Sequence, residues 1–165
     1  AFSNHNGDER GLVVYHNKYA DTRGWIKNSA AAMDIASGKL IQKTLSEALS
    51  LPKEAYAIFM DYVTGLEYIR SCQELTEKGI FLELGGYQCH VFLDWRIVNG
   101  EQWLVVCKAL NGTGVPSVDG KFDELFAAKV EEKIVAEKRV INKKAKSGKK
   151  TAKPRKNQSK PKTTL

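Results

Sequence analysis

The chain has 165 residues, of which 42% are hydrophobic and 27% are charged. This composition is typical of a globular domain that is large enough to bury a core. No run of eighteen apolar residues occurs, so we expect no membrane-spanning helix and no membrane partner, and no signal peptide is visible. The first residue is Ala1 rather than Met, and we expect the chain to be a fragment of a longer protein.

The net charge of +7 belongs to one end of the chain. Residues 142–165 hold ten Lys and Arg side chains and no acid, whereas residues 1–141 hold 16 basic and 19 acidic side chains, a net charge of −3. Such a tail binds polyanions, including nucleic acids, without sequence preference. The candidate contacts are Lys149, Lys150, Lys153, Arg155 and Lys156. A merely solubilising extension is an equal alternative.

The three cysteines, Cys72, Cys89 and Cys107, are odd in number and lack metal-binding spacing. We expect free thiols, with Cys89 buried, because free cysteine is among the most buried residue types. Free thiols favour a reducing compartment such as the cytoplasm. The histidines are scattered along the chain, so we expect no metal site and no cofactor.

The hydrophobic pattern divides the chain in order. Residues 1–11 are polar and predict a flexible segment, and residues 12–100 predict an antiparallel β domain. Within that domain, runs of strand-forming residues predict strands at Leu12–Tyr15, Tyr56–Asp61 and Leu66–Arg70, the last two joined by a short turn.

The remaining segments favour helix or loop. Apolar residues at helical spacing predict a helix over Lys39–Leu49, and Gln73–Lys78 is typical of a loop. A helical extension is predicted over residues 101–142, with one helix at Gln102–Leu110 and a second from Asp119 to about Lys143. Residues 143–165 predict a disordered Lys-rich tail, because they lack the apolar residues that a core requires.

The stretch Gly79–Val98 predicts the central hairpin. Gly85 and Gly86 suit a two-residue turn, because glycine holds positive φ angles at no steric cost. The predicted register places Tyr87 opposite Leu84 in an apolar row on one face, and Glu83 opposite Gln88 on the other. We expect Leu82, Val91 and Leu93 of the apolar row to be among the most buried residues. The predicted fold class is mainly β: an antiparallel β-sandwich followed by C-terminal helices and a disordered basic tail.

Candidate catalytic and binding residues are few. A glycosidase needs two carboxylates that face one another across a sugar, but Glu83 and Asp94 are roughly 20 Å apart in the predicted hairpin. Asp61 and Glu67 flank a turn and are the best remaining pair. Exposed aromatic rings beside polar groups would bind carbohydrate. Most aromatic residues have core spacing, whereas Tyr19 and Tyr62 lie in polar stretches and are the candidate carbohydrate contacts.

Three stretches together resemble one family. They are Leu12–Ile26 (LVVYHNKYADTRGWI), Asp61–Ser71 (DYVTGLEYIRS) and Leu82–Arg96 (LELGGYQCHVFLDWR), and Gly114–Ser117 also fits. The segment from Gly11 to Phe126 resembles the C-terminal part of large bacterial α-amylase-type proteins of glycoside hydrolase family 13. In that family an all-β C-terminal domain follows a catalytic (β/α)₈ barrel.

The resemblance implies a fold and a setting rather than an activity. The chain is too short for a barrel of about 250 residues, and it contains none of the family's catalytic motifs. We therefore expect a non-catalytic accessory domain, also described as a stabilising domain, whose partner is the catalytic barrel of the same polypeptide and whose parent acts on α-glucan. Two alternatives stay open. One is a polyanion-binding module that acts through the tail, and the other is a carbohydrate-binding module that acts through exposed aromatic residues.

Overall fold

The computed structural model describes residues 1–127. The chain divides into two compact units, Ala1–Leu125 and Phe126–Leu165, and the fold described below is that of the first. The predicted Lys-rich tail, the second helix beyond residue 127 and the five candidate polyanion contacts lie outside the described residues. No helix in residues 1–127 is long and apolar enough to cross a membrane.

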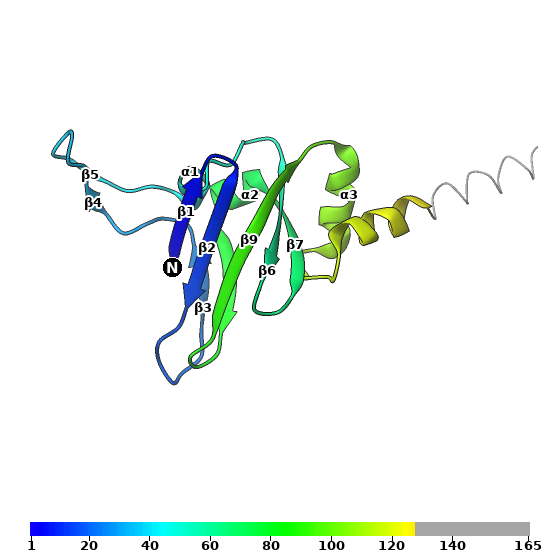
Figure 1. Cartoon of the computed structure of the whole chain (residues 1–165), viewed down its shortest axis with the longest axis horizontal. Helices are drawn as coiled ribbons and strands as arrows, with labels where there is room; N and C mark the ends of the chain where they lie inside the picture. Colours follow the sequence, from blue (N-terminus) through cyan, green and yellow to red (C-terminus); the bar gives the residue numbers. More distant parts are fainter. Residues whose placement is uncertain (128–165) are drawn as a thin grey trace, which may run out of the picture. The chain divides into compact units, whose positions relative to one another are not determined.

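A five-stranded antiparallel sheet forms the body of the first unit (Figure 1). Its spatial order is β1 (Phe2–Asn6), β2 (Glu9–Tyr15), β9 (Cys89–Val98), β6 (Tyr56–Asp61) and β7 (Leu66–Ser71). The predicted mainly β, antiparallel class is confirmed, as are the strands within β2, β6 and β7. The prediction of a flexible segment over residues 1–11 is wrong. Strand β1 pairs with β2 over its whole length, from Phe2 opposite Val13 to Asn6 opposite Glu9.

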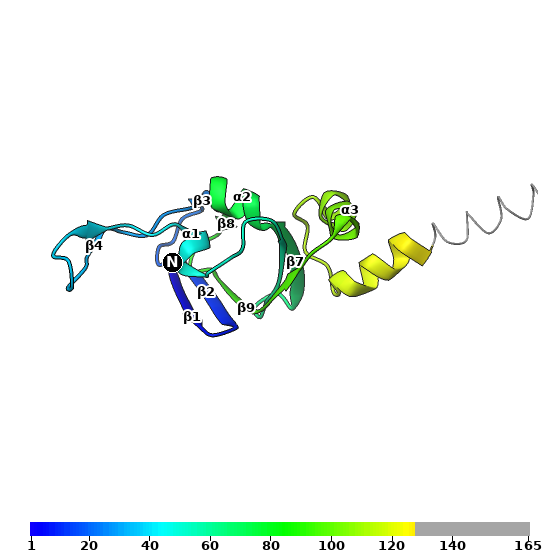
Figure 2. The ribbon, with the colours of Figure 1, turned by 90° about the horizontal axis from the view of Figure 1, so that it is seen from above.

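A two-stranded ribbon covers one face of this sheet. It consists of β3 (Thr22–Ile26) and β8 (Ile80–Leu84), and helices α1 (Leu45–Ala48) and α2 (Cys72–Glu77) lie on the same side (Figure 2). The core fills the space between. Its largest fully buried members from the sheet are Phe59, Phe92 and Leu12, and Ile80 and Leu84 of the ribbon are buried in the same cluster.

The predicted hairpin over Gly79–Val98 is wrong. Strand β8 pairs with β3, whereas β9 pairs with β2 and β6. The chain crosses from ribbon to sheet through residues 85–88, where the Gln88 amide donates to the Gly85 carbonyl over 3.2 Å. The left-handed residue of this turn is Tyr87 (φ 57°), and neither glycine has a positive φ. Gly86 is needed for space instead, since a Cβ there would lie 3.2 Å from Tyr19 Cα.

A bulge in β9 decides which of its residues are buried. Ile58 of β6 lies opposite Arg96 and Met60 lies opposite Leu93, so two steps along β6 match three along β9. Asp94 absorbs the extra residue with a φ of 51°. Such a bulge reorients the side chains beyond it.

The bulge explains why Trp95 is buried on the same side of β9 as Phe92. Phe92 and Trp95 are three residues apart, yet both face the core, and the Trp95 ring stacks on Phe59 with centroids 4.2 Å apart. The prediction that Leu82, Val91 and Leu93 are among the most buried residues is wrong, since all three are only partly buried. Val91 and Leu93 alternate with core-facing Phe92, and in β8 the more buried residues are Ile80 and Leu84. Cys89, expected to be buried, is exposed at the start of β9, although all three cysteines are free as predicted.

Of the helices after β7, α3 was predicted and α2 was not. The predicted Gln102–Leu110 helix is confirmed as α3 (Glu101–Leu110), which ends at left-handed Asn111. The predicted loop at Gln73–Lys78 is wrong: it is α2, whose first turn is capped when Ser71 Oγ accepts a hydrogen bond from the Glu74 amide. A further helix begins at Val118, one residue before the predicted start.

The predicted Lys39–Leu49 helix is largely wrong. Only α1 is helical, and it begins behind a capping box formed by Thr44 and Glu47. Residues Leu40–Ile41 are strand β5, which pairs with β4 (Ala32–Met33). A helix cannot extend back through Thr44, since that residue has the extended backbone of an N-cap (ψ 160°).

Candidate functional site

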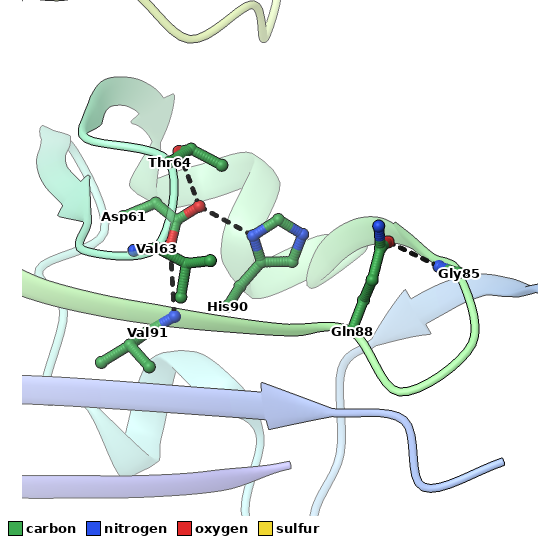
Figure 3. Close-up of polar contacts among 7 residues, drawn as sticks. All are labelled: Asp61, Val63, Thr64, Gly85, Gln88, His90 and Val91. Carbon is green, nitrogen blue, oxygen red and sulfur yellow. Dashed lines mark hydrogen bonds and ion pairs between the residues drawn. The ribbon is translucent and has the colours of Figure 1, made fainter.

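The end of β6 carries a buried carboxylate with four hydrogen-bond donors around it (Figure 3). Asp61 is fully buried. One of its oxygens accepts from the amides of Val63 (3.1 Å) and Val91 (3.2 Å). The other accepts from Thr64 Oγ1 (2.7 Å) and from His90 Nδ1 (2.8 Å). This network joins the β6–β7 turn to β9, which lies 29 residues further along the chain.

The charge on Asp61 is stabilised by these donors. Burial opposes ionisation, but the bonds from His90, Thr64, Val63 and Val91 outweigh it and lower the pKa of Asp61. An ionised carboxylate only accepts, so His90 carries a proton on Nδ1. The other ring nitrogen, Nε2, points away from Asp61 (Figure 3), and the ring stacks on Phe92 with centroids 5.5 Å apart.

An Asp–His pair orients an imidazole in many catalytic sites, but it needs a nucleophile within hydrogen-bond reach of the second nitrogen. No hydroxyl or thiol of the described residues is hydrogen-bonded to Nε2 of His90. The adjacent Cys89 is on the opposite side of the strand by alternation. We therefore interpret the pair as a structural anchor that orients His90 beside a cleft.

The second candidate carboxylate is also used structurally. Glu67 lies opposite Met60, whereas Asp61 lies opposite Leu66, so the Asp61 and Glu67 side chains point to opposite faces of the sheet. Glu67 Oε2 accepts from the Val118 amide over 2.7 Å, and the Glu67 backbone pairs with Val115. This pair does not face a common sugar position, and Glu67 instead holds the segment after α3 on the edge of β7.

An open cleft of about 940 Å³ is lined by residues of the ribbon, of the sheet and of α3. Trp25 and Phe81 line it from the ribbon, Tyr68 and His90 line it from the sheet, and α3 contributes Leu104. Arg70 also lines the cleft. Its pKa is lowered by burial, and it donates to the Gly112 carbonyl over 2.9 Å. Among residues 1–127, no group of three or more His, Cys, Asp or Glu side chains is placed to hold a metal ion.

The two predicted carbohydrate contacts have different surroundings. Tyr62 is partly exposed and its hydroxyl donates to Asp94 over 2.5 Å, a bond that raises the pKa of Tyr62. Tyr19 is 90% exposed, and its ring lies 6.4 Å from that of Tyr87, which is 66% exposed. The structure therefore brings Tyr19 together with Tyr87, which was predicted to lie on the buried face. Tyr62 belongs to the β6–β7 turn and is not part of this ring pair.

A second pocket, of about 480 Å³, adjoins the end of the ribbon. Polar side chains line most of it, among them Asp21, Arg23, Glu83 and Gln88. The predicted hairpin concealed this grouping, because it placed Glu83 opposite Gln88 instead of opposite Arg23 on β3.

Four exposed apolar residues lie on an arm. Residues 29–43, which contain β4 and β5, extend away from the rest of the unit (Figures 1 and 2). Ile35 at its tip is 98% exposed, and Met33, Leu40 and Ile41 are exposed as well. The tip is held by Asp34, whose carboxylate accepts from the Ser37 amide and hydroxyl, and by Gly38 at a φ of 64°.

A scan against protein-family models, a search of curated proteins and a search of solved structures each found no match to this chain.

Two features of the site were missed from the sequence. The Asp61 network had a local signal, because an Asp at a strand end followed by Thr64 and Gly65 is typical of a turn that its carboxylate caps. Its partner His90 had none, since only the pairing of β6 with β9 brings the two together. Tyr87 was missed because the wrong hairpin register assigned it to the buried face.

Proposed function

We propose that the chain is a non-catalytic accessory β-domain of an α-amylase-type glycoside hydrolase, with a sandwich-like arrangement of sheet and ribbon. The three stretches that carry the family resemblance fall on structurally central parts of the unit: β2–β3, the β6–β7 turn with β7, and β8–β9. Asp61 and His90, both within these stretches, support the fold rather than a reaction.

The arm carries this proposal. A stand-alone domain rarely leaves a contiguous group of large apolar side chains in water, yet Met33 and Leu40 face each other across β4 and β5 and both are exposed. The ordered turn at Asp34 and Ser37 fixes the arm's shape before any contact forms. A preorganised apolar arm fits a domain interface, since little conformational entropy remains to be lost on docking.

The test is to compare this chain alone with a longer product that includes the polypeptide encoded upstream of Ala1. We expect an in-frame catalytic barrel there and slower amide exchange in residues 29–43 of the longer product. Met33→Lys with Leu40→Lys should weaken that protection, whereas Lys27→Glu, a charge change at the base of the arm, should not. A start codon directly before the codon for Ala1, or equal exchange of the arm in both products, would contradict the proposal of an accessory domain.

A second candidate function is carbohydrate binding, favoured by the exposed Tyr19–Tyr87 ring pair beside a polar pocket. Retention of the chain on immobilised starch, released by soluble maltodextrin, tests it. The polyanion alternative depends on residues outside the described part of the chain. It predicts nucleic-acid affinity that falls with salt and disappears when residues 143–165 are deleted.

A further inference from the structure

The outward face of the β3–β8 ribbon combines aromatic and polar side chains in register. Arg23 lies opposite Glu83, and Trp25 lies opposite Phe81. Because side chains alternate along a strand, these four share one face, and all four are exposed while Ile80 and Leu84 of the same ribbon are buried. A polar pair and an aromatic pair therefore sit side by side, about 7 Å apart at the usual strand rise.

A second aromatic pair stands at the end of this ribbon. Tyr19 precedes the first residue of β3 by three positions, and Tyr87 follows the last residue of β8 by three. The loops that hold them are joined, because the Tyr87 amide donates to the Lys18 carbonyl over 3.2 Å. The left-handed backbone of Tyr87 is sparsely populated by residues other than glycine and is kept by the surrounding contacts. Both rings are thus displayed on an ordered support.

We propose that this surface, the ribbon strip, binds a neutral linear glucan chain. The strip consists of Tyr19, Arg23, Trp25, Phe81, Glu83 and Tyr87. The proposal rests on the carbohydrate-binding candidate above and names its site. It is distinct from the arm, which we assign to the domain interface.

The lining of the strip selects the ligand class. The Trp25 and Phe81 rings, with centroids 5.4 Å apart, offer apolar faces, and apolar faces of sugar rings pack on such surfaces. The 480 Å³ pocket next to them presents two carboxylates, Asp21 and Glu83, against one guanidinium, Arg23. This balance repels polyanions, whereas hydroxyl groups of a neutral ligand can donate to the carboxylates and accept from the guanidinium.

The strip also has the length for more than one sugar unit. Glu83 lines both the 480 Å³ pocket and the 940 Å³ cleft, so the two hollows meet at that side chain. A ligand lying along the strip would therefore contact aromatic, polar and again aromatic groups in turn. An apolar protein segment would remove water from the charged Arg23 and Glu83 side chains and offer them no hydrogen-bonding groups in return, which is costly.

The experiment measures binding of maltoheptaose to the 165-residue chain by NMR titration, with cellohexaose and a heparin oligosaccharide as comparison ligands. We expect maltoheptaose to shift the indole resonance of Trp25. Trp25→Ala and Tyr19→Ala should each weaken binding roughly ten-fold, about 1.4 kcal/mol. Tyr87→Asn should do the same, since Asn removes the ring but tolerates the left-handed backbone. Phe2→Ala, a matched loss of an exposed aromatic residue outside the strip, on edge strand β1 of the five-stranded sheet, should leave affinity unchanged.

The outcomes distinguish failure of the ribbon strip as the binding site from failure of carbohydrate binding itself. Binding that is weakened by the three strip variants and not by Phe2→Ala supports the ribbon strip. Glucan binding that none of the three variants changes overturns the strip but leaves the carbohydrate-binding candidate standing. No binding of either neutral oligosaccharide at millimolar concentration overturns both, and strip variants that weaken only heparin binding overturn the assignment of ligand class. Thermal unfolding of each variant shows that the fold is intact.

Discussion

Removal of the Asp61 carboxylate gives the sharpest test of how the fold is held together. Asp61→Ala leaves the Val63 and Val91 amides, Thr64 Oγ1 and His90 Nδ1 without their common acceptor. A buried donor left without an acceptor costs about 1–3 kcal/mol. These four bonds are only partly buried, so relaxation and entering water recover part of the sum. We expect a loss of about 3–5 kcal/mol in the free energy of unfolding, a large part of the 5–15 kcal/mol typical of a domain.

Asp61→Asn is the informative companion variant. The amide oxygen can still accept from Val63 and Val91, while its NH₂ group can donate to Thr64 Oγ1 and to His90 Nδ1 once the imidazole proton moves to Nε2. Only the charge assistance is lost, so we expect a cost of about 1–2 kcal/mol. The control is Asp94→Asn, an exposed left-handed position that Asn tolerates and where the amide oxygen can still accept from Tyr62. The expected change is within about 0.5 kcal/mol.

Urea unfolding at pH 7, followed by circular dichroism, measures these free energies, and long-range ¹H–¹⁵N spectra of the imidazole identify which nitrogen of His90 carries the proton. A cost below about 1 kcal/mol for Asp61→Ala would refute the inference that the four donors depend on this buried acceptor. Equal costs for Asp61→Ala and Asp61→Asn, or an unchanged His90 tautomer in Asp61→Asn, would refute the exchange of hydrogen bonds described above.

Three further predictions concern the same unit. Gly79→Ala should cost more than 3 kcal/mol or prevent folding, because its Cβ would lie 2.2 Å from the Ile26 carbonyl oxygen. Gly65→Ala, also at a positive φ but in open space, should cost only about 1 kcal/mol. Urea unfolding compares the two variants, and equal costs would contradict the close approach of Gly79 to Ile26. The pKa of Asp61 is lowered in the folded state, so the stability that its charge contributes is present above the ordinary pKa of about 3.9 and is lost as pH falls through the folded pKa. The free energy of unfolding should therefore fall more steeply with acid for the native chain than for Asp61→Asn. Parallel curves for the two proteins would contradict the lowered pKa. Cys89 is exposed, whereas Cys72 is buried and burial raises its pKa to about 11. A thiol reagent should therefore label Cys89 in the folded chain and Cys72 only after unfolding. Labelling of Cys72 in the folded chain would show that the core opens.

The sequence alone predicted the elements that depend on neighbours in the chain. The strands at Tyr56–Asp61 and Leu66–Arg70 were predicted because the turn between them closes over four residues, and they pair along their whole length. The Gln102–Leu110 helix was predicted from its apolar spacing and its stop at Asn111–Gly112. Tyr19 was correctly placed in an exposed loop, since nothing around it in the sequence is apolar enough to bury it.

Only the tertiary structure decided how β8 and β9 are used. Gly85 and Gly86 have the local chemistry of a hairpin turn, but β8 buries Ile80 and Leu84 by pairing with β3, more than fifty residues earlier. That long-range choice exposed Tyr87 and set Glu83 beside Arg23. The bulge at Asp94 depends likewise on the fit of β9 against β6. Alternation cannot reveal either, because the period of two specifies which residues share a face and not which strand lies beside them.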